Sequence, residues 1–530
     1  MSSATLTPDA TDRGEPRLDP SLRERLLRHV VVTGPRDEIV VTTPFTEEVL
    51  GAIPSGTEED VEEAVARARR AQPMWAARSF AERARVLMRL HDLLFERQDE
   101  VLDLIQLESG KVRAHAYEEV ADVAMVAAYY ARTARRHLKD QRREGALPGL
   151  TATTEVRHPK GVVGFIAPWN YPLSMAITDA IPALMAGNGC VIKPAQTTPF
   201  TALWIVDLFK EAGLPADLLT VVTGRGSVIG SPLIARSDFV TFTGSTEVGR
   251  SVAEQAGERL IGCALELGGK NAMLVLEDAD LDKAVDGAIR GCFASAGQLC
   301  ISIERLFVHA SVVDEFTRRF VAAVDDLVLT PELEWGGDMG SLQSRSQLET
   351  VTSHVDDARA KGATILTGGD PRPDLGPLFH APTVLADVTD DMTVSSEETF
   401  GPVVTIYPFA TEDEAVARAN DSVYGLNASV WTKDTRRGAR IAARIQSGTV
   451  NVNDSYAATW GSTDAPMGGF KDSGLGRRHG REGIHKYTEV QTISVQRGFP
   501  VGTMPFLDQE ATAKALSTAL RILHRIPGLR

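Results

Sequence analysis

Gly161-Val-Val-Gly-Phe-Ile-Ala-Pro-Trp-Asn170 is the first of four short apolar runs, and each run ends at a loop carrying Pro, Gly or a polar residue. The other three are Gly189–Ile192, Leu218–Val222 and Phe239–Phe242. Helical patterns separate the runs, and this alternation is typical of a parallel sheet with helices on both faces. Because ligands bind outside the carboxyl ends of such strands, the four ends predict a nucleotide site.

The rest of the chain continues this α/β organisation. A helical tract at about 57–140 precedes the four runs, and a second α/β block extends from Asn271 to about 445, with a long helix predicted over 312–327. The strand-like segments Thr151–Val156 and Gln491–Val495 lie outside the alternation. They are predicted to pair as a small third sheet.

Composition excludes several classes of protein. The 530 residues are too many for one hydrophobic core, and 43% hydrophobic with 24% charged residues is ordinary for a soluble globular protein. A net charge of −15 argues against nucleic-acid binding. No stretch is apolar and long enough to span a membrane.

The termini and the cysteines favour a cytoplasmic location. The first twenty residues mix charge, Pro and Ser without an apolar core, which fits a solvated leader better than a secretory or transit peptide. The four cysteines are dispersed and show neither a metal-ligand spacing nor a disulfide framework: Cys190, Cys263, Cys292 and Cys300.

Cys300 is the candidate nucleophile. It ends the small-residue run Phe293-Ala-Ser-Ala-Gly-Gln-Leu-Cys300, and Glu266 lies upstream on the glycine-rich segment Glu266-Leu-Gly-Gly-Lys270. A free thiol is mostly protonated at neutral pH, so this chemistry requires a base or a positive field, and Glu266 is the candidate base. The alternative is that Cys300 is a small buried hydrophobic residue.

Two loops are candidate cofactor or oxyanion sites. In Phe242-Thr-Gly-Ser245, Ser245 either opens an anion-binding helix N-terminus or is an ordinary N-cap. Asn170 either donates its amide to a developing oxyanion or is a turn residue. The glycines of Gly224–Gly230 miss the dinucleotide fingerprint by one residue.

Together these segments resemble the aldehyde dehydrogenase superfamily over about residues 40–490. The resemblance rests on seven motifs in the family's order: Ala167-Pro-Trp-Asn170, Lys193-Pro-Ala-Gln196, Phe242-Thr-Gly-Ser245, Glu266-Leu-Gly-Gly-Lys270, Gly297-Gln-Leu-Cys300, Glu398-Thr-Phe-Gly-Pro402 and Pro466-Met-Gly-Gly-Phe-Lys-Asp-Ser-Gly474. It implies that Cys300 adds to the aldehyde, that Asn170 holds the oxyanion and that Glu266 activates the water that releases the acid.

The resemblance also implies a cofactor site. It places these residues there: Trp169, Asn170, Lys193, Pro194, Ala195, Gln196, Gly244, Ser245, Leu267, Glu398 and Phe400. Many NAD-preferring members have Glu at the position of Gln196, and loss of that charge removes repulsion of a 2′-phosphate. With Lys193 nearby, and Arg225 as a second candidate cation, this favours NADP, with NAD as the alternative. No metal is implied.

Within the superfamily the chain resembles the actinobacterial NADP-dependent succinate-semialdehyde dehydrogenases, through segments such as Cys300–Arg305, Tyr424–Trp431 and Gly474–Gly480. One departure stands against that substrate. Arginines that bind the substrate carboxylate in better-known members correspond to Thr178 and Ala294, and Ser462 offers only a hydroxyl. The alternative is an uncharged aliphatic or aromatic aldehyde, which Trp460 and Tyr456 would suit if they do not pack in a subunit interface.

The fold implied is aldehyde-dehydrogenase-like: a Rossmann-type cofactor domain, an α/β catalytic domain and a small β oligomerisation element. The predicted segments are a flexible leader (1–30), the NAD(P)-binding domain (31–145 and 159–271), the catalytic domain (272–445), oligomerisation strands (146–158 and 487–497), a return segment (446–486) and a C-terminal helical extension (505–530). The implied assembly is a homodimer or homotetramer. The extension is amphipathic and basic, and either packs on protein or lies on a membrane surface.

Three alternative functions fit the sequence less well: an acylating dehydrogenase, a non-redox thiol hydrolase and an inactive scaffold. An acylating dehydrogenase has no need of the base Glu266, which speaks against it. A non-redox thiol hydrolase or an inactive scaffold does not account for the full set Asn170, Glu266, Cys300 and Glu398. A local redox-switch disulfide is excluded because position 302 is Ser, and Cys292 is predicted to be buried.

Overall fold

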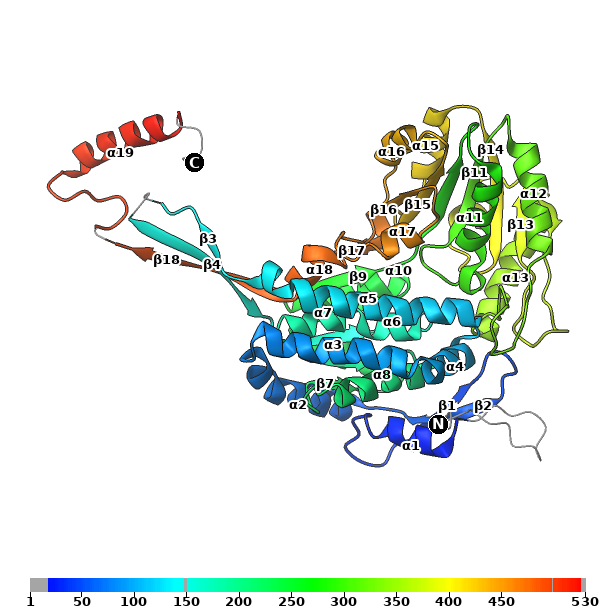
Figure 1. Cartoon of the computed structure of the whole chain (residues 1–530), viewed down its shortest axis with the longest axis horizontal. Helices are drawn as coiled ribbons and strands as arrows, with labels where there is room; N and C mark the ends of the chain where they lie inside the picture. Colours follow the sequence, from blue (N-terminus) through cyan, green and yellow to red (C-terminus); the bar gives the residue numbers. More distant parts are fainter. Residues whose placement is uncertain (1–17, 147–149, 498, 526–530) are drawn as a thin grey trace.

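The computed structural model describes residues 18–146, 150–497 and 499–525. Two α/β bodies lie side by side, and an antiparallel arm projects away from one of them (Figure 1). In the described part of the chain, no helix is both long and apolar enough to cross a membrane.

The first body is built on a six-stranded sheet whose strands are parallel except for β17. In spatial order the strands are β17 (Gly474–Leu475), β9 (Gly262–Glu266), β8 (Phe239–Thr243), β5 (Val162–Ile166), β6 (Gly189–Lys193) and β7 (Leu219–Val221). The four predicted apolar runs are confirmed as β5 to β8. Their side chains are almost all buried because helices cover both faces of the sheet.

Helices on each face of this sheet form separate apolar clusters. One face carries α3 (Phe80–Glu96), α4 (Gln98–Ser109), α5 (Arg113–Leu138), α6 (Pro172–Ile177), α7 (Ala180–Met185) and α8 (Pro199–Glu211). The other carries α2 (Glu58–Ala76), α9 (Gly226–Arg236) and α10 (Thr246–Glu258). A separate hairpin pairs β1 (Glu38–Thr42) with β2 (Val49–Pro54).

The prediction of a flexible leader over residues 1–30 is wrong from residue 18 onward. Asp19 caps α1 (Pro20–Leu27) by accepting the backbone N–H groups of Ser21 and Leu22. Leu22 and Leu26 are buried in the large apolar cluster of the first body. These two leucines fix the segment, while residues 1–17 lie outside the described range.

The second body contains a seven-stranded sheet. In spatial order its strands are β12 (Thr364–Thr367), β13 (Thr383–Ala386), β14 (Val403–Phe409), β11 (Ile303–His309), β10 (Asn271–Val275), β15 (Asn427–Trp431) and β16 (Thr449–Val452). The packed helices are α11 (Leu281–Phe293), α12 (Val313–Asp325) and α13 (Arg345–Ala360) on one side, and α15 (Glu412–Asn420) and α16 (Thr435–Ala442) on the other. The helix predicted over 312–327 is confirmed as α12. The sheet continues past residue 445, because β16 pairs with β15.

The chain then returns to the first body. This segment contains α17 (Ala457–Trp460), a short 3₁₀ turn (Lys471–Ser473), β17 and α18 (Gly480–His485). Because β17 pairs with β9, residue Gly474 lies opposite Glu266.

The arm is a three-stranded antiparallel sheet of β18 (Thr488–Gln496), β4 (Thr151–Pro159) and β3 (Gln141–Arg143). The predicted pairing of the two distant segments is confirmed, with Thr492 opposite Glu155. β3 was not predicted. The helix α19 (Gln509–Leu523) lies at the far end of the arm, away from both bodies (Figure 1).

Candidate functional site

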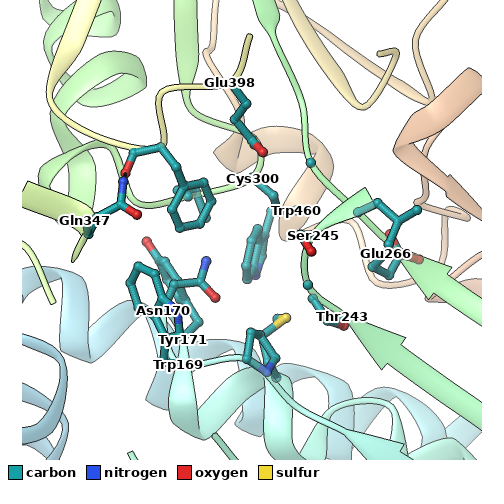
Figure 2. Close-up of a pocket in the computed structure, with 17 residues that line it drawn as sticks. Trp169, Asn170, Tyr171, Thr243, Ser245, Glu266, Cys300, Gln347, Glu398 and Trp460 are labelled. Carbon is teal, nitrogen blue, oxygen red and sulfur yellow. Dashed lines mark hydrogen bonds between the residues drawn. The ribbon is translucent and has the colours of Figure 1, made fainter. Parts of the chain in front are cut away.

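A pocket of about 250 Å³ lies where the two bodies meet. Figure 2 shows Trp169, Asn170 and Tyr171 at the lower left, Gln347 at the left above them, Glu398 at the top, and Thr243, Ser245 and Glu266 at the right. Its lining residues are Pro168, Trp169, Asn170, Tyr171, Met175, Thr243, Gly244, Ser245, Glu266, Leu267, Gly268, Leu299, Cys300, Gln347, Glu398, Phe400 and Trp460. The pocket therefore brings together Cys300, Glu266 and Asn170, which the sequence separates widely.

The parallel sheet explains how the first body contributes to this pocket. The chain leaves β5 at Ile166, β8 at Thr243 and β9 at Glu266, and the loops that follow carry Asn170, Ser245 and Leu267 respectively. Thr243 pairs with Glu266 in the β8–β9 ladder, so these loops emerge at one edge of the sheet.

A strained turn carries Cys300. After α11 ends at Phe293, Ser295 and Ala296 adopt left-handed φ angles of 51° and 56°, and Gly297 follows with 70°. Left-handed non-glycine residues are costly, so the surroundings must hold them. Here the N–H of Ser295 donates to His115 Nδ1 at 3.2 Å, and its hydroxyl donates to Tyr171 at 3.0 Å.

Asn170 contacts the turn directly. Its Nδ2 donates to the carbonyl oxygen of Gln298 at 3.0 Å. An amide nitrogen carries two hydrogens, so one N–H fixes the side chain and the second is available to a ligand. This suits the predicted oxyanion donor better than the alternative of a plain turn residue.

Glu266 is buried at the end of β9, with 5% of its surface exposed. Its Oε1 has no hydrogen-bond partner among the described residues. Burial raises the pKa of this carboxyl to about 7, although the charges of Arg478 and Lys486 oppose the shift. A carboxyl group that titrates near neutral pH is suited to take a proton from water.

The environment of Cys300 keeps its sulfur protonated. Burial, followed by the negative charges of Glu398 and Glu266, raises the pKa of the thiol to about 12. No lysine or arginine is present among the described lining residues. The sequence left open that a positive charge activates the thiol, but the described pocket lining contains no such charge. A base must therefore remove the thiol proton during attack.

This environment predicts slow alkylation of Cys300. With cofactor absent, we expect the rate with iodoacetamide to keep rising from pH 7 to pH 10, because the thiolate fraction of a thiol with a pKa of about 12 grows throughout that range. Mass spectrometry of the Cys300 peptide measures the rate. The Cys300→Ala variant gives the background alkylation, which comes from the half-exposed Cys263. A plateau below pH 9 would contradict the description of the pocket.

The loop of Glu398 is held by two residues that the sequence did not single out. Glu304 accepts the backbone N–H groups of Thr399 and Phe400 at 3.0–3.1 Å and pairs with Lys270 at 2.5 Å. Gln347 Nε2 donates to the carbonyl oxygens of Thr399 and Phe400. The available signal for Glu304 was a charged residue inside the apolar strand β11.

Glu398 also lies against the glycine-rich segment. Its Oε1 accepts the N–H of Gly269 at 2.8 Å, and a Cβ at Gly268 would lie 2.2 Å from its Oε2. Only glycine allows this approach. Burial raises the pKa of Glu398 to about 8.

A second group of predicted cofactor residues lies outside the pocket lining, along the loop that follows β6. Lys193 and Pro194 are buried, Ala195 is half-buried and Gln196 is exposed. Burial lowers the pKa of the Lys193 ammonium to about 8, with no compensating carboxylate among the described residues. A Cβ at Gly226, the first residue of α9, would lie 3.8 Å from Lys193 Nζ.

These features fit an anionic dinucleotide. Lys193 is a largely buried cation without a counter-ion in the described structure, and α10 begins directly after Ser245. Ser245 Oγ accepts the N–H of Val248 at 3.5 Å, so it caps the helix as well as lining the pocket. Both interpretations of Ser245 are therefore compatible with the structure.

Aromatic side chains line much of the pocket. Trp460 packs against Tyr171 with ring centroids 5.7 Å apart, and Trp169 meets Phe400 edge-on at 5.5 Å. Tyr456 lies behind this wall, where its hydroxyl donates to Glu118. Ser462 is exposed and donates to the carbonyl oxygen of Ala458 at 2.7 Å, so the structure does not place it in the pocket.

Two buried cations stand behind the pocket wall, and the sequence did not identify either. Lys111 Nζ lies 3.5 Å from the centre of the Tyr171 ring and pairs with Glu119 at 2.7 Å. Arg478 Nη1 lies 3.2 Å from Met175 Sδ, and its Nη2 donates to Thr178 Oγ1.

Comparisons with known proteins agree with this site. The sequence model of the Aldehyde dehydrogenase family matches residues 31–493. A Mycolicibacterium smegmatis protein named "Putative succinate-semialdehyde dehydrogenase (NADP(+))" is 50% identical over 484 residues, which cover 91% of this chain and 94% of that protein.

Solved structures show the same fold. An Escherichia coli NADP dependent enzyme gives a TM-score of 0.85 at 35% identity, covering 89% of this chain and 99% of the other. Betaine aldehyde dehydrogenase from Staphylococcus aureus, in complex with NAD+, gives 0.85 at 32% identity, covering 92% and 98%. From the family match, the relatives and the shared fold, this chain belongs to the aldehyde dehydrogenase family.

Proposed function

We propose that this enzyme oxidises succinate semialdehyde to succinate with reduction of NADP. The observation that carries the oxidation is the convergence of Cys300, Glu266 and Asn170 in one pocket. Mycobacterial relatives that are 50% and 51% identical to this chain support the choice of substrate and cofactor, because they are named as putative NADP-dependent succinate-semialdehyde dehydrogenases.

In the proposed reaction, the Cys300 sulfur adds to the aldehyde carbon as its proton passes to Glu266. The free N–H of Asn170 and the backbone N–H of Cys300 hold the oxyanion of the resulting thiohemiacetal. A nicotinamide cofactor, when bound, would supply the hydride acceptor for this step. Loss of hydride leaves a thioester on Cys300. Glu266 releases the thiol's proton to solvent, and its carboxylate then takes a proton from the water that hydrolyses the thioester and returns it to the leaving sulfur. The products are the acid and the regenerated thiol.

Gln196 supports the preference for NADP. It is exposed beside the buried Lys193, and it brings no negative charge to the expected position of the ribose. Arg225, the exposed N-cap residue of α9, lies next to Gly226 and adds a second positive charge at this edge.

We expect Gln196→Glu to shift preference towards NAD. A carboxylate at this position repels a 2′-phosphate and accepts hydrogen bonds from ribose hydroxyls, so the ratio of kcat/KM for NADP to that for NAD should fall about tenfold, equivalent to ~1.4 kcal/mol. Steady-state kinetics with both cofactors measure the ratio. Arg250→Gln, at an exposed residue of α10, is the control. An unchanged ratio in Gln196→Glu would show that Gln196 does not set the cofactor preference.

An uncharged aldehyde is the second candidate substrate. The observation that favours it is the aromatic pocket wall, together with the absence of lysine or arginine from the described lining. A semialdehyde carboxylate in this pocket lacks the bidentate arginine that usually receives such a group.

One assay separates these possibilities. The absorbance of reduced cofactor is followed with succinate semialdehyde, hexanal and benzaldehyde, each with NAD and NADP. The proposal predicts the highest kcat/KM for succinate semialdehyde with NADP. Preference for hexanal or benzaldehyde would overturn the substrate alone, and absence of turnover with every aldehyde would overturn the function.

We further propose that the enzyme is a cytoplasmic homodimer or homotetramer. The edge strand β18 exposes Val490, Ile493 and Val495, and we propose that it extends a sheet of a second copy. Light scattering after size-exclusion chromatography gives the mass, and a monomer at micromolar concentration would contradict this proposal.

A further inference from the structure

We propose that Arg478 is a positioning residue that holds the buried Glu266 in its carboxylate form, and so sets the lower pH limit of thioester hydrolysis. This inference rests on the proposed role of Glu266 as the base. It goes beyond that role because it assigns a task to a residue outside the pocket lining.

The negative charge of Glu266 lacks a compensating partner in its immediate surroundings in the described structure. Glu266 is 5% exposed, and its Oε1 has no hydrogen-bond partner among the described residues. A carboxylate buried without hydrogen bonds is strongly disfavoured unless a positive charge lies nearby. The pocket lining offers no such charge in the described structure.

Arg478 is the basic residue placed to supply a positive charge near Glu266. The pairing of β17 with β9 sets Gly474 opposite Glu266, four residues before Arg478. The backbone of Arg478 is then fixed by reciprocal hydrogen bonds with Met467. Its guanidinium reaches the back of the pocket, where Nη1 lies 3.2 Å from the sulfur of Met175.

Arg478 shares its ion-pair partner Asp179 with a second cation, Lys486. The side chain of Arg478 is 7% exposed. Its Nε lies 3.2 Å from Asp179 Oδ2 but makes no hydrogen bond, and the thioether of Met175 is a weak acceptor. Asp179 also pairs with Lys486 at 2.9 Å, so one carboxylate serves two cations.

The surrounding charges fix the sign of the effect. Burial is the largest effect on Glu266 and raises its pKa. Of the charged groups that act on it, Arg478, Lys486 and Arg477 lower the pKa, and Asp179 raises it. Arg478 is itself stabilised by Asp179, Glu266 and Asp122, with Tyr487 a smaller contributor. The buried His479 has its pKa lowered to about 3, so it adds no charge near neutrality.

Removal of Arg478 should therefore raise the pKa of Glu266, and removal of Asp179 should lower it. With the Glu266 pKa at about 7, half of the base is ionised at pH 7. A rise of about one unit leaves about a tenth ionised, so hydrolysis at pH 7 should slow about fivefold. The acidic limb is the part of the pH profile where the hydrolysis rate falls as the pH drops. It should move to higher pH when Arg478 is removed and to lower pH when Asp179 is removed.

The experiment measures hydrolysis separately from hydride transfer. The full-length enzyme is mixed with NADP and aldehyde, transferred to buffers from pH 5 to pH 9 and quenched, and loss of the acyl group from Cys300 is followed by intact mass. Arg478→Gln should move the acidic limb up by about one pH unit, and Arg478→Lys, which keeps the charge, should stay within about 0.3 units of wild type. Asp179→Asn should move it down. Arg481→Gln, at an exposed residue of α18, is the matched control.

Several outcomes decide the inference. It is overturned if the limb of Arg478→Gln coincides with that of wild type, or if Arg478→Gln and Asp179→Asn shift it in the same direction. Thermal unfolding checks each variant. If Arg478→Gln does not fold, the other two variants still decide. The inference predicts a downward shift of the limb in Asp179→Asn and no shift in Arg478→Lys. It is overturned if the limb of Asp179→Asn stays in place or moves up.

Glu266→Gln separates this inference from the proposed function. If that variant loses its acyl group as fast as wild type, the role of Glu266 as the base fails. If it is slow while Arg478→Gln keeps the wild-type limb, the role of Arg478 fails alone.

Discussion

Cys300→Ala abolishes aldehyde-dependent reduction of NADP, with a loss of at least about a thousandfold in kcat, because no other described group in the pocket can form the covalent bond to the aldehyde carbon. Binding of NADP should remain within about twofold of wild type, since the predicted cofactor contacts come from Lys193, Ser245 and Glu398.

Steady-state kinetics and calorimetric titration with NADP measure the two effects. Cys263→Ala is the control, because Cys263 is a half-exposed cysteine of β9 outside the pocket lining. Retention of a tenth of the wild-type kcat by Cys300→Ala would show that another group is the nucleophile.

Glu266→Gln slows thioester hydrolysis by about 10²- to 10⁴-fold, because the neutral amide cannot take a proton from water. Hydride transfer is affected less, so a burst of reduced cofactor close to one equivalent of active sites should precede a slow steady state. In the wild-type enzyme, hydrolysis should fall as the pH drops through about 7, where the buried Glu266 becomes protonated.

Stopped-flow absorbance resolves the burst from the steady state. Glu258→Gln, at an exposed glutamate of α10, serves as the control. Loss of the burst in Glu266→Gln would assign the glutamate mainly to deprotonation of the thiol of Cys300.

The sequence predicted the part of the site that follows from strand order. Asn170 and Ser245 follow the carboxyl ends of two predicted apolar runs, and the ends of parallel strands meet at one edge of the sheet. The strand β9, which ends at Glu266, was not predicted, and Glu266 was singled out from its glycine-rich motif. The family motifs added Cys300 and Glu398, which come from the second body. Their shared pocket depends on the fit between the two bodies, which no local pattern encodes.

Residues that act through tertiary contacts were not predictable in the same way. Arg478 reaches Thr178 and Met175 only because β17 pairs with β9. Glu304 is one charged residue in an apolar strand, and its partners Lys270 and Phe400 lie far away in sequence.

The charges around Cys300 could not be predicted from the sequence either. The sequence allowed either a base or a positive field beside Cys300. The structure places two carboxylates, Glu266 and Glu398, close enough to raise the pKa of the thiol. That effect depends on burial and distance, which only the folded chain provides.

The most direct test of the central claim is to trap the acyl group on Cys300. Glu266→Gln is mixed with NADP and succinate semialdehyde, quenched in acid within the burst, digested and analysed by mass spectrometry. We expect the succinyl group on the peptide that contains Cys300 and on no peptide that contains Cys190, Cys263 or Cys292. Formation of reduced cofactor without an acyl group on Cys300 would contradict the account.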